Sequence, residues 1–327
     1  MNASTPKHYS GLYLHTDFFT LVSANRDQIV SVNYRELIQP FRPSLLGANK
    51  DAIARYTDVI LDLIKESKTE AENAGIVLTQ DMVLVKRIQV PIGLDAGSVD
   101  DHLEWEVKQY CPSEAGKFTN VFYKLPFQSK EGNPYYISVL VRKEVTRFIK
   151  KLMDKTGLII RDIDVDLFSH VRTVTTNYPS QGDQIQLLIV IYKKQIHYIF
   201  IKKNEYLFSS EMPAPVGVQE LARLSAPELA DIIFKKIKQL LFGHKISETL
   251  TDIEHIYILG GPQKKDMYEL LSEQTSVPVQ SAEPFHHIPV SDLVARVERQ
   301  TLPVECLSAG LGAVLKNNPA LTKSQIT

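Results

Sequence analysis

Cysteine is scarce in this sequence. Its two cysteines, Cys111 and Cys306, are far apart and belong to no Cys-x-x-Cys or Cys/His spacing. This pattern argues against a disulfide framework and against a cysteine-based metal site. The pattern is typical of a protein of the reducing cytoplasm, and we expect both thiols to be buried in its fold.

An excess of charge and a long apolar run are also missing. Lys and Arg number 37 against 38 Asp and Glu, so overall charge favours neither nucleic acid nor an anionic lipid surface as the main partner, although a local patch stays open. No stretch approaches the roughly 20 apolar residues that span a bilayer, and the first five residues lack a leader pattern. We expect a cytoplasmic protein that inserts into no membrane and reaches one only through a partner.

What is present is an ordinary globular composition, 44% hydrophobic over 327 residues, long enough for about two domains. One pattern of several strands, a helix and a further strand occurs twice, from Tyr9 and again from Gln184. Turn-forming residues at 178–183 separate the two copies. Two such halves with a hinge between them predict an α/β, two-lobed actin-like fold.

A third block interrupts the first half. Its pattern predicts a helix over 98–110 with Ser98 as N-cap, strands over 120–125 and 135–141, and a helix over 143–156. We interpret it as a small inserted α+β subdomain. The predicted boundaries are 1–79 and 158–180 for the first lobe, 80–157 for the insert, 181–300 for the second lobe, and 301–327 for a closing helix and tail.

A short apolar strand, Ile256–Gly261, ends on paired glycines before a predicted helix over 264–274, and a short strand over 277–279 follows. Glycines at such a strand end let a ligand approach free backbone N–H groups and the positive end of the helix dipole. Actin-like folds hold adenosine in this way. A tight turn without a ligand gives the same pattern, so this motif alone leaves both interpretations open.

The most specific motif is Trp105–Pro112, which reads Trp-Glu-Val-Lys-Gln-Tyr-Cys-Pro. It is similar to the Trp-Glu-x-x-Gln-Tyr-x-Pro helix end of the PilM family of pilus-assembly proteins, which are relatives of FtsA in the actin/sugar-kinase superfamily. The segments 87–91, 157–166, 258–261 and 309–313 resemble other parts of that family. The small residues of 309–313 resemble its closely packed closing helix.

The sequence departs from the nucleotide-binding members at both phosphate hairpins. Where they carry Asp-x-Gly-[Ser/Thr], this chain has Tyr13-Leu14-His15-Thr16, and the second hairpin has the apolar run 189–191. Without the acids and glycines, the metal site and the phosphate contacts are lost. Asp166 lies where active members place an acid facing the metal-bound water, or it caps the helix that follows. The degenerate cleft is expected at Tyr13, His15, Thr16, Asp166, Ile191, Gly260 and Gly261.

The resemblance implies a non-catalytic scaffold of a type IV pilus or a related type II secretion-like machine, without cofactor or metal. Its partner would be the cytoplasmic tail of a PilN-like inner-membrane protein, so the chain would lie peripherally at that membrane. The alternative is a genuine Mg-ATP-binding ATPase of the same machinery. An FtsA-like membrane filament is disfavoured because residues 317–327 lack an amphipathic apolar face; self-association is left open.

The partner tail is expected in a groove between the insert and the first lobe. The predicted lining is Trp105, Tyr110 and Phe122, with Glu106 and Lys108 at the rim. For Trp105 the alternative is a core residue of the insert. Two weaker patterns are interpreted structurally: Asp162, Asp164 and Asp166 as a strand with one wet face, and His286-His287 as a surface loop.

Overall fold

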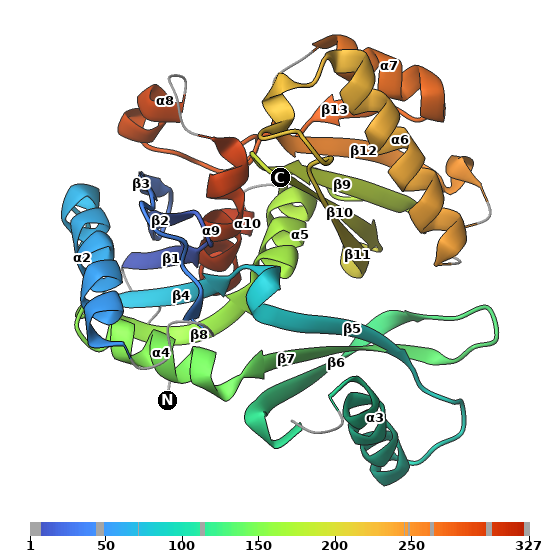
Figure 1. The fold of residues 1–327 in the computed structure, drawn as a ribbon, viewed down its shortest axis with the longest axis horizontal. Coiled ribbons are helices and arrows are strands. Elements are labelled where there is room, and N and C mark those ends of the chain that lie inside the picture. Colours follow the sequence, from blue (N-terminus) through green and yellow to red (C-terminus); the bar gives the residue numbers. More distant parts are fainter. Residues whose placement is uncertain are drawn as a thin grey trace.

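The computed structural model describes residues 8–43, 49–70, 72–111, 115–244, 246–247, 249–261, 265–298 and 303–323. Over these residues the chain forms two lobes and a third, smaller sheet (Figure 1). The two five-stranded sheets have the same topology, with a three-stranded antiparallel meander followed by two parallel strands. The predicted two-lobed fold and its internal repetition are therefore confirmed.

The sheet of the first lobe has the order β3-β2-β1-β4-β8. Its strands are β1 (His8–Leu14), β2 (Phe18–Asn25), β3 (Ile29–Glu36), β4 (Asn73–Leu78) and β8 (Ile159–Val165). One face is covered by α2 (Lys50–Ser67) and α4 (Lys143–Met153). Helix α2 begins at Asn49, whose side chain accepts two backbone N–H bonds, and it buries Ile53, Tyr56 and Ile60 at helical spacing.

The sheet of the second lobe has the order β11-β10-β9-β12-β13. Its strands are β9 (Ile185–Ile191), β10 (Gln195–Lys202), β11 (Glu205–Pro213), β12 (Ile253–Gly260) and β13 (Val279–Ser281). The helices α6 (Ala226–Gly243) and α7 (Lys265–Thr275) pack together on its outer face (Figure 1). Ser225 and Glu228 form a reciprocal capping box that begins α6.

Two helices, α5 (Asp166–Asn177) and α9 (Val304–Asn317), lie between the lobes. Small residues allow α9 to approach its neighbours closely: a Cβ at Gly11 would lie 1.9 Å from the Gly310 carbonyl oxygen, and one at Gly312 would lie 2.1 Å from the Ser169 carbonyl oxygen. The predicted close packing of the closing helix is confirmed. The short helices α8 (Asp292–Glu298) and α10 (Ala320–Lys323) precede and follow α9 in the chain.

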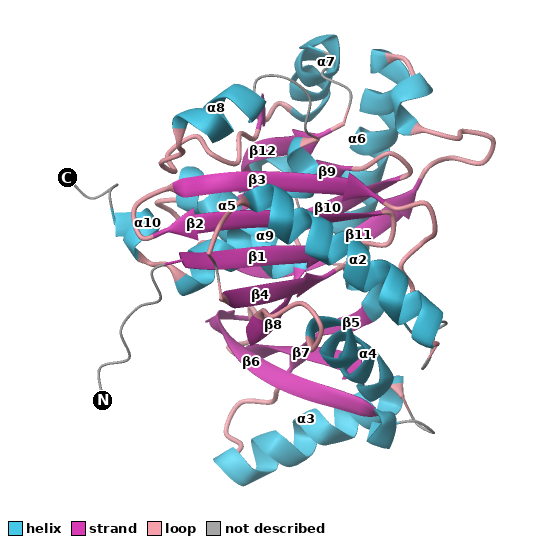
Figure 2. Cartoon of the chain, turned by 90° about the vertical axis from the view of Figure 1, so that its left-hand side faces the viewer, coloured by secondary structure: helices cyan, strands magenta, loops and turns pink. Residues whose placement is uncertain are grey.

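The small sheet has the order β5-β7-β6 and lies beyond β8, the edge strand of the first lobe (Figure 2). Its strands are β5 (Val83–Gln89), β6 (Phe118–Gln128) and β7 (Pro134–Arg142). Helix α3 (Ala96–Tyr110) covers one face through a small core that contains Ile88, Val90 and Leu103. Helix α4 follows β7 but buries its apolar face in the first lobe.

Three local predictions need correction. The N-cap of α3 is Asp95, whose carboxylate accepts the Ser98 N–H at 2.9 Å, so the helix begins earlier than predicted. The strand β13 lies two residues later than the predicted 277–279 because its backbone pairs with β12 from Val279. Cys306 is buried as expected, whereas Cys111 is partly exposed at the end of α3. Pro112 lies outside the described residues.

Candidate functional site

The two hairpins and the paired glycines meet at the junction of the lobes. Gly260 and Gly261 have φ values of 78° and 73°, and a Cβ on Gly261 would lie 2.8 Å from the Cβ of Ile191. Both glycines therefore hold a backbone conformation that other residues rarely adopt. In this structure Gly261 packs directly on Ile191 of the second hairpin, which is fully buried.

Aromatic rings fill the space between the hairpins. The His15 ring stacks on Phe18 with centroids 4.2 Å apart and on Tyr192 at 5.1 Å. Tyr13 is fully buried and meets both His15 and Phe18 edge to face. Residues from the first hairpin thus pack on Tyr192 of the second, in the place where a phosphate would need free backbone N–H groups.

A chain of polar contacts joins the two lobes through this aromatic cluster. The Tyr13 hydroxyl donates to Asp166 at 3.0 Å and lies 3.2 Å from the Tyr192 hydroxyl. Tyr192 in turn lies 2.9 Å from Nε2 of His170, whose Nδ1 lies 3.1 Å from the Ser308 hydroxyl. Strand β1, α5, the second hairpin and α9 are therefore linked by one buried network.

The ionisable groups at this junction have strongly shifted pKa values because they are buried. Burial raises the pKa values of the Asp166 and Glu305 carboxyls to about 7, and it lowers those of the His15, His170 and His197 imidazoles to about 3. The Glu305 side chain packs over Gly260, where a Cβ would lie 2.4 Å from its Oε2. An acid therefore covers the paired glycines, and the imidazoles supply no positive charge at neutral pH.

The two remaining predicted cleft residues have structural partners. Thr16 donates its hydroxyl to Asp81 at 2.8 Å, and Asp166 accepts the Leu167 N–H at 2.7 Å. Asp166 is the first residue of α5 and not its N-cap, which is Val165. The structure brings together Tyr13, His15, Asp166, Ile191, Gly260 and Gly261, and aromatic side chains pack in the space between the two hairpins.

Replacing Asp166 by asparagine is expected to change how stability depends on pH. The folded-state pKa of Asp166, about 7, lies above its ordinary 3.8, so its contribution is fully present below about pH 4 and is lost as the pH rises through 7. Asparagine resembles the protonated acid at every pH. The melting temperature of Asp166→Asn relative to wild type should therefore rise between pH 4 and 7, and a difference that stays constant over this range would contradict the assignment.

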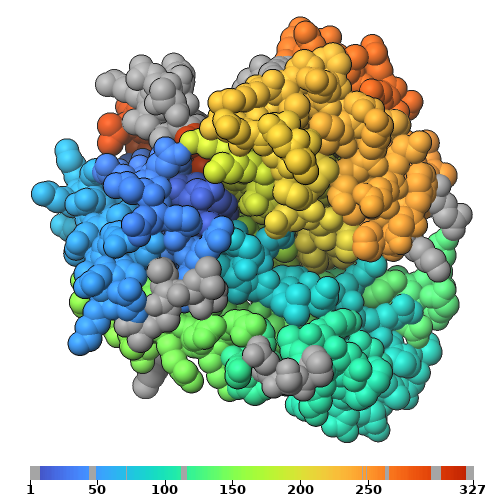
Figure 3. All heavy atoms as spheres, in the orientation of Figure 1, coloured from blue at the N-terminus to red at the C-terminus, as the bar shows by residue number. Residues whose placement is uncertain are grey.

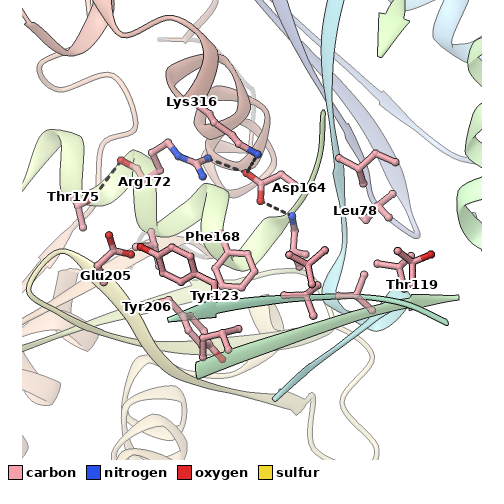
Figure 4. A pocket seen from close by; sticks show the side chains of 18 of the residues that line it. Leu78, Thr119, Tyr123, Asp164, Phe168, Arg172, Thr175, Glu205, Tyr206 and Lys316 are labelled. Atoms are coloured by element: carbon pink, nitrogen blue, oxygen red, sulfur yellow. Dashed lines mark hydrogen bonds and ion pairs between the residues drawn. The ribbon is translucent and has the colours of Figure 1, made fainter. Parts of the chain in front are cut away.

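A groove of about 760 Å³ lies between the small sheet and the first lobe (Figure 4). The small sheet contributes mostly apolar side chains, and β8, α5 and the β10–β11 turn form the opposite walls. Its lining includes Val83, Thr119, Val121, Tyr123, Ile137, Val139, Val141, Thr146, Ile163, Val165, Phe168, Val171, Asn204, Glu205 and Tyr206. Val121 and Tyr123 are 62% and 51% exposed, so part of this apolar surface is open to solvent.

Polar groups in the groove are concentrated at its edges. Arg172 pairs with the largely buried Asp164 at 3.1 Å and also donates to the Gly312 carbonyl at 2.8 Å, and Lys316 lies 3.7 Å from Asp164 (Figure 4). On another wall Tyr123 donates to Glu205, whose pKa is raised by burial. The central lining is therefore apolar, and its charged rim is largely self-neutralised.

The partner-binding residues predicted from sequence do not line this groove. Phe122 points to the opposite face of the small sheet, into the core under α3, and Trp105 lies on α3 with 54% of its surface exposed. The interpretation of Trp105 as a core residue is therefore wrong. Tyr110 donates to Glu106 at 3.2 Å on the same helix. A groove lies where the sequence predicted one, but the predicted lining residues come from the opposite face of the small sheet. The prediction from sequence that these side chains bind the partner is tested against the groove by Trp105→Ala.

Alternation along β6 was the signal that identifies the groove residues. Neighbouring side chains of a strand point to opposite faces, so Val121 and Tyr123 lie in the groove when Phe122 packs under α3. On strand β8, Asp162 and Asp164 share one face, where Lys316 approaches both carboxylates. Asp162 also accepts from Tyr9 and Asn317, and Asp164 is buried in the groove wall. The interpretation of these aspartates as one wet face is wrong, because Asp164 and Asp166 are buried.

Two lobes of matching topology, closed by a central helix and carrying a small inserted sheet, define the chain as an actin-like protein. The profile of the family described as type IV pilus assembly protein PilM matches residues 27–215, which is more than half of the chain. The chain therefore belongs to the PilM family of type IV pilus assembly proteins. The resemblance inferred from the Trp105–Pro112 motif is thereby confirmed.

One of the solved structures that resemble this chain supports the same fold. A structure described as the PilM-PilN type IV pilus biogenesis complex matches with a TM-score of 0.75 and 18% identity over 96% of this chain and 99% of that chain. A Bacteroides thetaiotaomicron protein with an actin-like ATPase fold matches with a TM-score of 0.46, 12% identity and coverage of 86% and 92%. The ethanolamine utilization protein EutJ of Carboxydothermus hydrogenoformans matches with a TM-score of 0.48 and 12% identity over 96% of this chain and 91% of that chain. No curated protein sequence matches the chain.

Proposed function

We propose that the chain is a non-catalytic scaffold of the type IV pilus machinery that holds the cytoplasmic tail of a PilN-like inner-membrane protein in the groove between the small sheet and the first lobe. The observation that carries this proposal is the open apolar groove bounded by β6 and β8, the edge strands of two different sheets. The similar solved structure is a complex of PilM with PilN, which supports the choice of partner. No helix among the described residues has the length and apolar character that a membrane span requires.

The shape and chemistry of the groove favour an extended, apolar segment. An edge strand offers unpaired backbone N–H and C=O groups to an added strand, and alternate side chains of that strand can enter the groove. Val121, Val139 and Ile163 supply apolar contacts, whereas the neighbouring Asp164 and Arg172 already neutralise each other. A tail with apolar residues at alternate positions and no charge between them would match this lining.

The non-catalytic part of the proposal is supported by the filled junction between the lobes. His15 and Tyr192 occupy the region between the two hairpins, and Glu305 covers the paired glycines. A nucleotide would have to displace a buried hydrogen-bonded network and place its phosphates beside acids. In intact sites each charge-assisted phosphate contact contributes roughly 1.5–3 kcal/mol, and the two described hairpins lack the acids and glycines that support such contacts.

One calorimetric experiment tests both parts. Millimolar Mg-ATP titrated into the full chain is expected to give no saturable heat, because neither hairpin, as described, carries the acid and glycine that would hold the metal and the phosphates. A synthetic peptide of the PilN-like tail from the same genome, titrated into the same sample, is expected to give saturable one-to-one binding that Mg-ATP does not alter. Saturable, magnesium-dependent heat from ATP would favour the ATPase alternative, and failure of the peptide to bind would refute the docking role.

A further inference from the structure

The most basic described helix of the protein is α4, and its cations face solvent. Over residues 143–155 five cationic side chains stand against two acids, whereas the whole chain has a net charge of −1. The cations are Lys143, Arg147, Lys150, Lys151 and Lys155, and all of them are exposed. The acids Glu144 and Asp154 are exposed beside them. This concentration of positive charge is local and does not follow from the composition of the chain.

The cations share one face because the apolar residues occupy the other. Helix α4 buries Val145, Phe148, Ile149, Leu152 and Met153 in the core of the first lobe. Positions 143, 147, 150 and 151 therefore project away from the sheet at helical spacing. In Figures 1 and 3 this green part of the chain lies at the lower left of the molecule, on its outer surface.

Among the described residues three of these cations have no ion-pair partner, and Lys143 donates to the Gly116 carbonyl oxygen at 2.8 Å. Lys235 of α6 pairs with Asp231, and Lys265 of α7 approaches Glu269. Across the described residues, by contrast, Arg147, Lys150 and Lys151 form no ion pair. Lys150 and Lys151 lie in the last turn of α4, where positive charge interacts favourably with the C-terminal end of the helix dipole. Arg147 lies outside that turn.

We propose that the exposed face of α4 is a second interaction surface, which adsorbs the protein to a bilayer of anionic phospholipids without insertion. Charge complementarity selects this occupant, since a flat array of unpaired cations fits the negative surface of a cytoplasmic leaflet. The apolar face of α4 is committed to the core, so the contact is electrostatic only. Thr146 of the same helix lines the groove, so adsorption through α4 turns one end of the groove toward the membrane.

Vesicle co-sedimentation of the full chain tests this surface. The protein should sediment with vesicles of about one third phosphatidylglycerol at about 0.05 M salt, remain soluble with pure phosphatidylcholine vesicles, and be released at about 0.5 M salt as the charges are screened. The triple variant Arg147→Gln, Lys150→Gln, Lys151→Gln should bind the anionic vesicles about tenfold more weakly or worse. Arg147→Gln alone should cause a partial loss and keeps the test valid if the triple variant unfolds.

The matched control removes three lysines from α6, at Lys235, Lys236 and Lys238. It changes the net charge equally and should bind the anionic vesicles as the wild type does. Equal binding by the triple α4 variant, equal loss in the α6 control, or full competition by millimolar inorganic phosphate would each overturn the proposal. Calorimetric binding of the PilN-like tail by the α4 variant is expected to be unchanged, so failure of this proposal is distinguishable from failure of the docking role.

Discussion

Replacing Gly312 by valine should unfold or severely destabilise the protein, by about 3 kcal/mol or more, with no change in any proposed ligand contact. A Cβ at this position would lie 2.1 Å from the carbonyl oxygen of Ser169, which is backbone of α5 and cannot move aside cheaply. The central pair of helices would have to separate, and overpacking of this kind is costly in a tight core. Thermal and urea denaturation measure the loss.

Gly243 provides the matched control for that substitution. It also lies in a helix, at the end of α6, but no heavy atom outside its own neighbourhood lies within 4 Å of a Cβ there. Gly243→Val should therefore leave the free energy of unfolding nearly unchanged. If the two variants melt alike, close packing of α9 is not what holds the lobes together.

The largest effect on binding is expected from Val121→Asp. Val121 lies in the groove and is 62% exposed in the free protein, so the substitution should leave the fold intact. A bound tail would bury the new carboxylate against apolar side chains without a partner, which is strongly unfavourable. Loss of a binding anchor costs about 2 kcal/mol or more, so the dissociation constant for the PilN-like tail should rise at least about thirtyfold.

Two controls separate groove binding from a general surface effect. Val216 is fully exposed on the second lobe, away from the groove lining, so Val216→Asp introduces the same charge and should bind the tail normally. Trp105→Ala tests the other face of the small sheet and should also leave binding unchanged. Loss of binding in Trp105→Ala with an intact fold would move the partner site to α3.

The two lobes were predictable from sequence because each strand and helix carries its own periodic pattern. The meander from Tyr9 and the one from Gln184 each form a sheet whose order matches the other. The paired glycines at 260–261 and the small residues at 309–313 were informative for the same reason, since a positive φ and a close helix approach both restrict the residue type locally.

The filled junction and the groove lining were only partly predictable, because both depend on residues far apart in sequence. The missing acids at the first hairpin were visible, but nothing local shows that His170 lies beside both Tyr192 and Ser308, which is 138 residues away. The face of β6 that borders the groove depends on which side α3 covers. Trp105 was predicted in the groove because an apolar and aromatic lining was expected, but residue type alone does not determine the direction of a side chain.

Photo-crosslinking of the PilN-like tail tests the central claim most directly. A photoreactive amino acid is placed either at Val121, in the groove, or at Trp105, on α3, and the full chain is irradiated with a synthetic tail peptide. We expect efficient crosslinking from position 121 that unlabelled tail peptide competes away, and little or none from position 105. Crosslinking from position 105 alone, with no adduct from position 121, would contradict the assignment of the groove as the partner site.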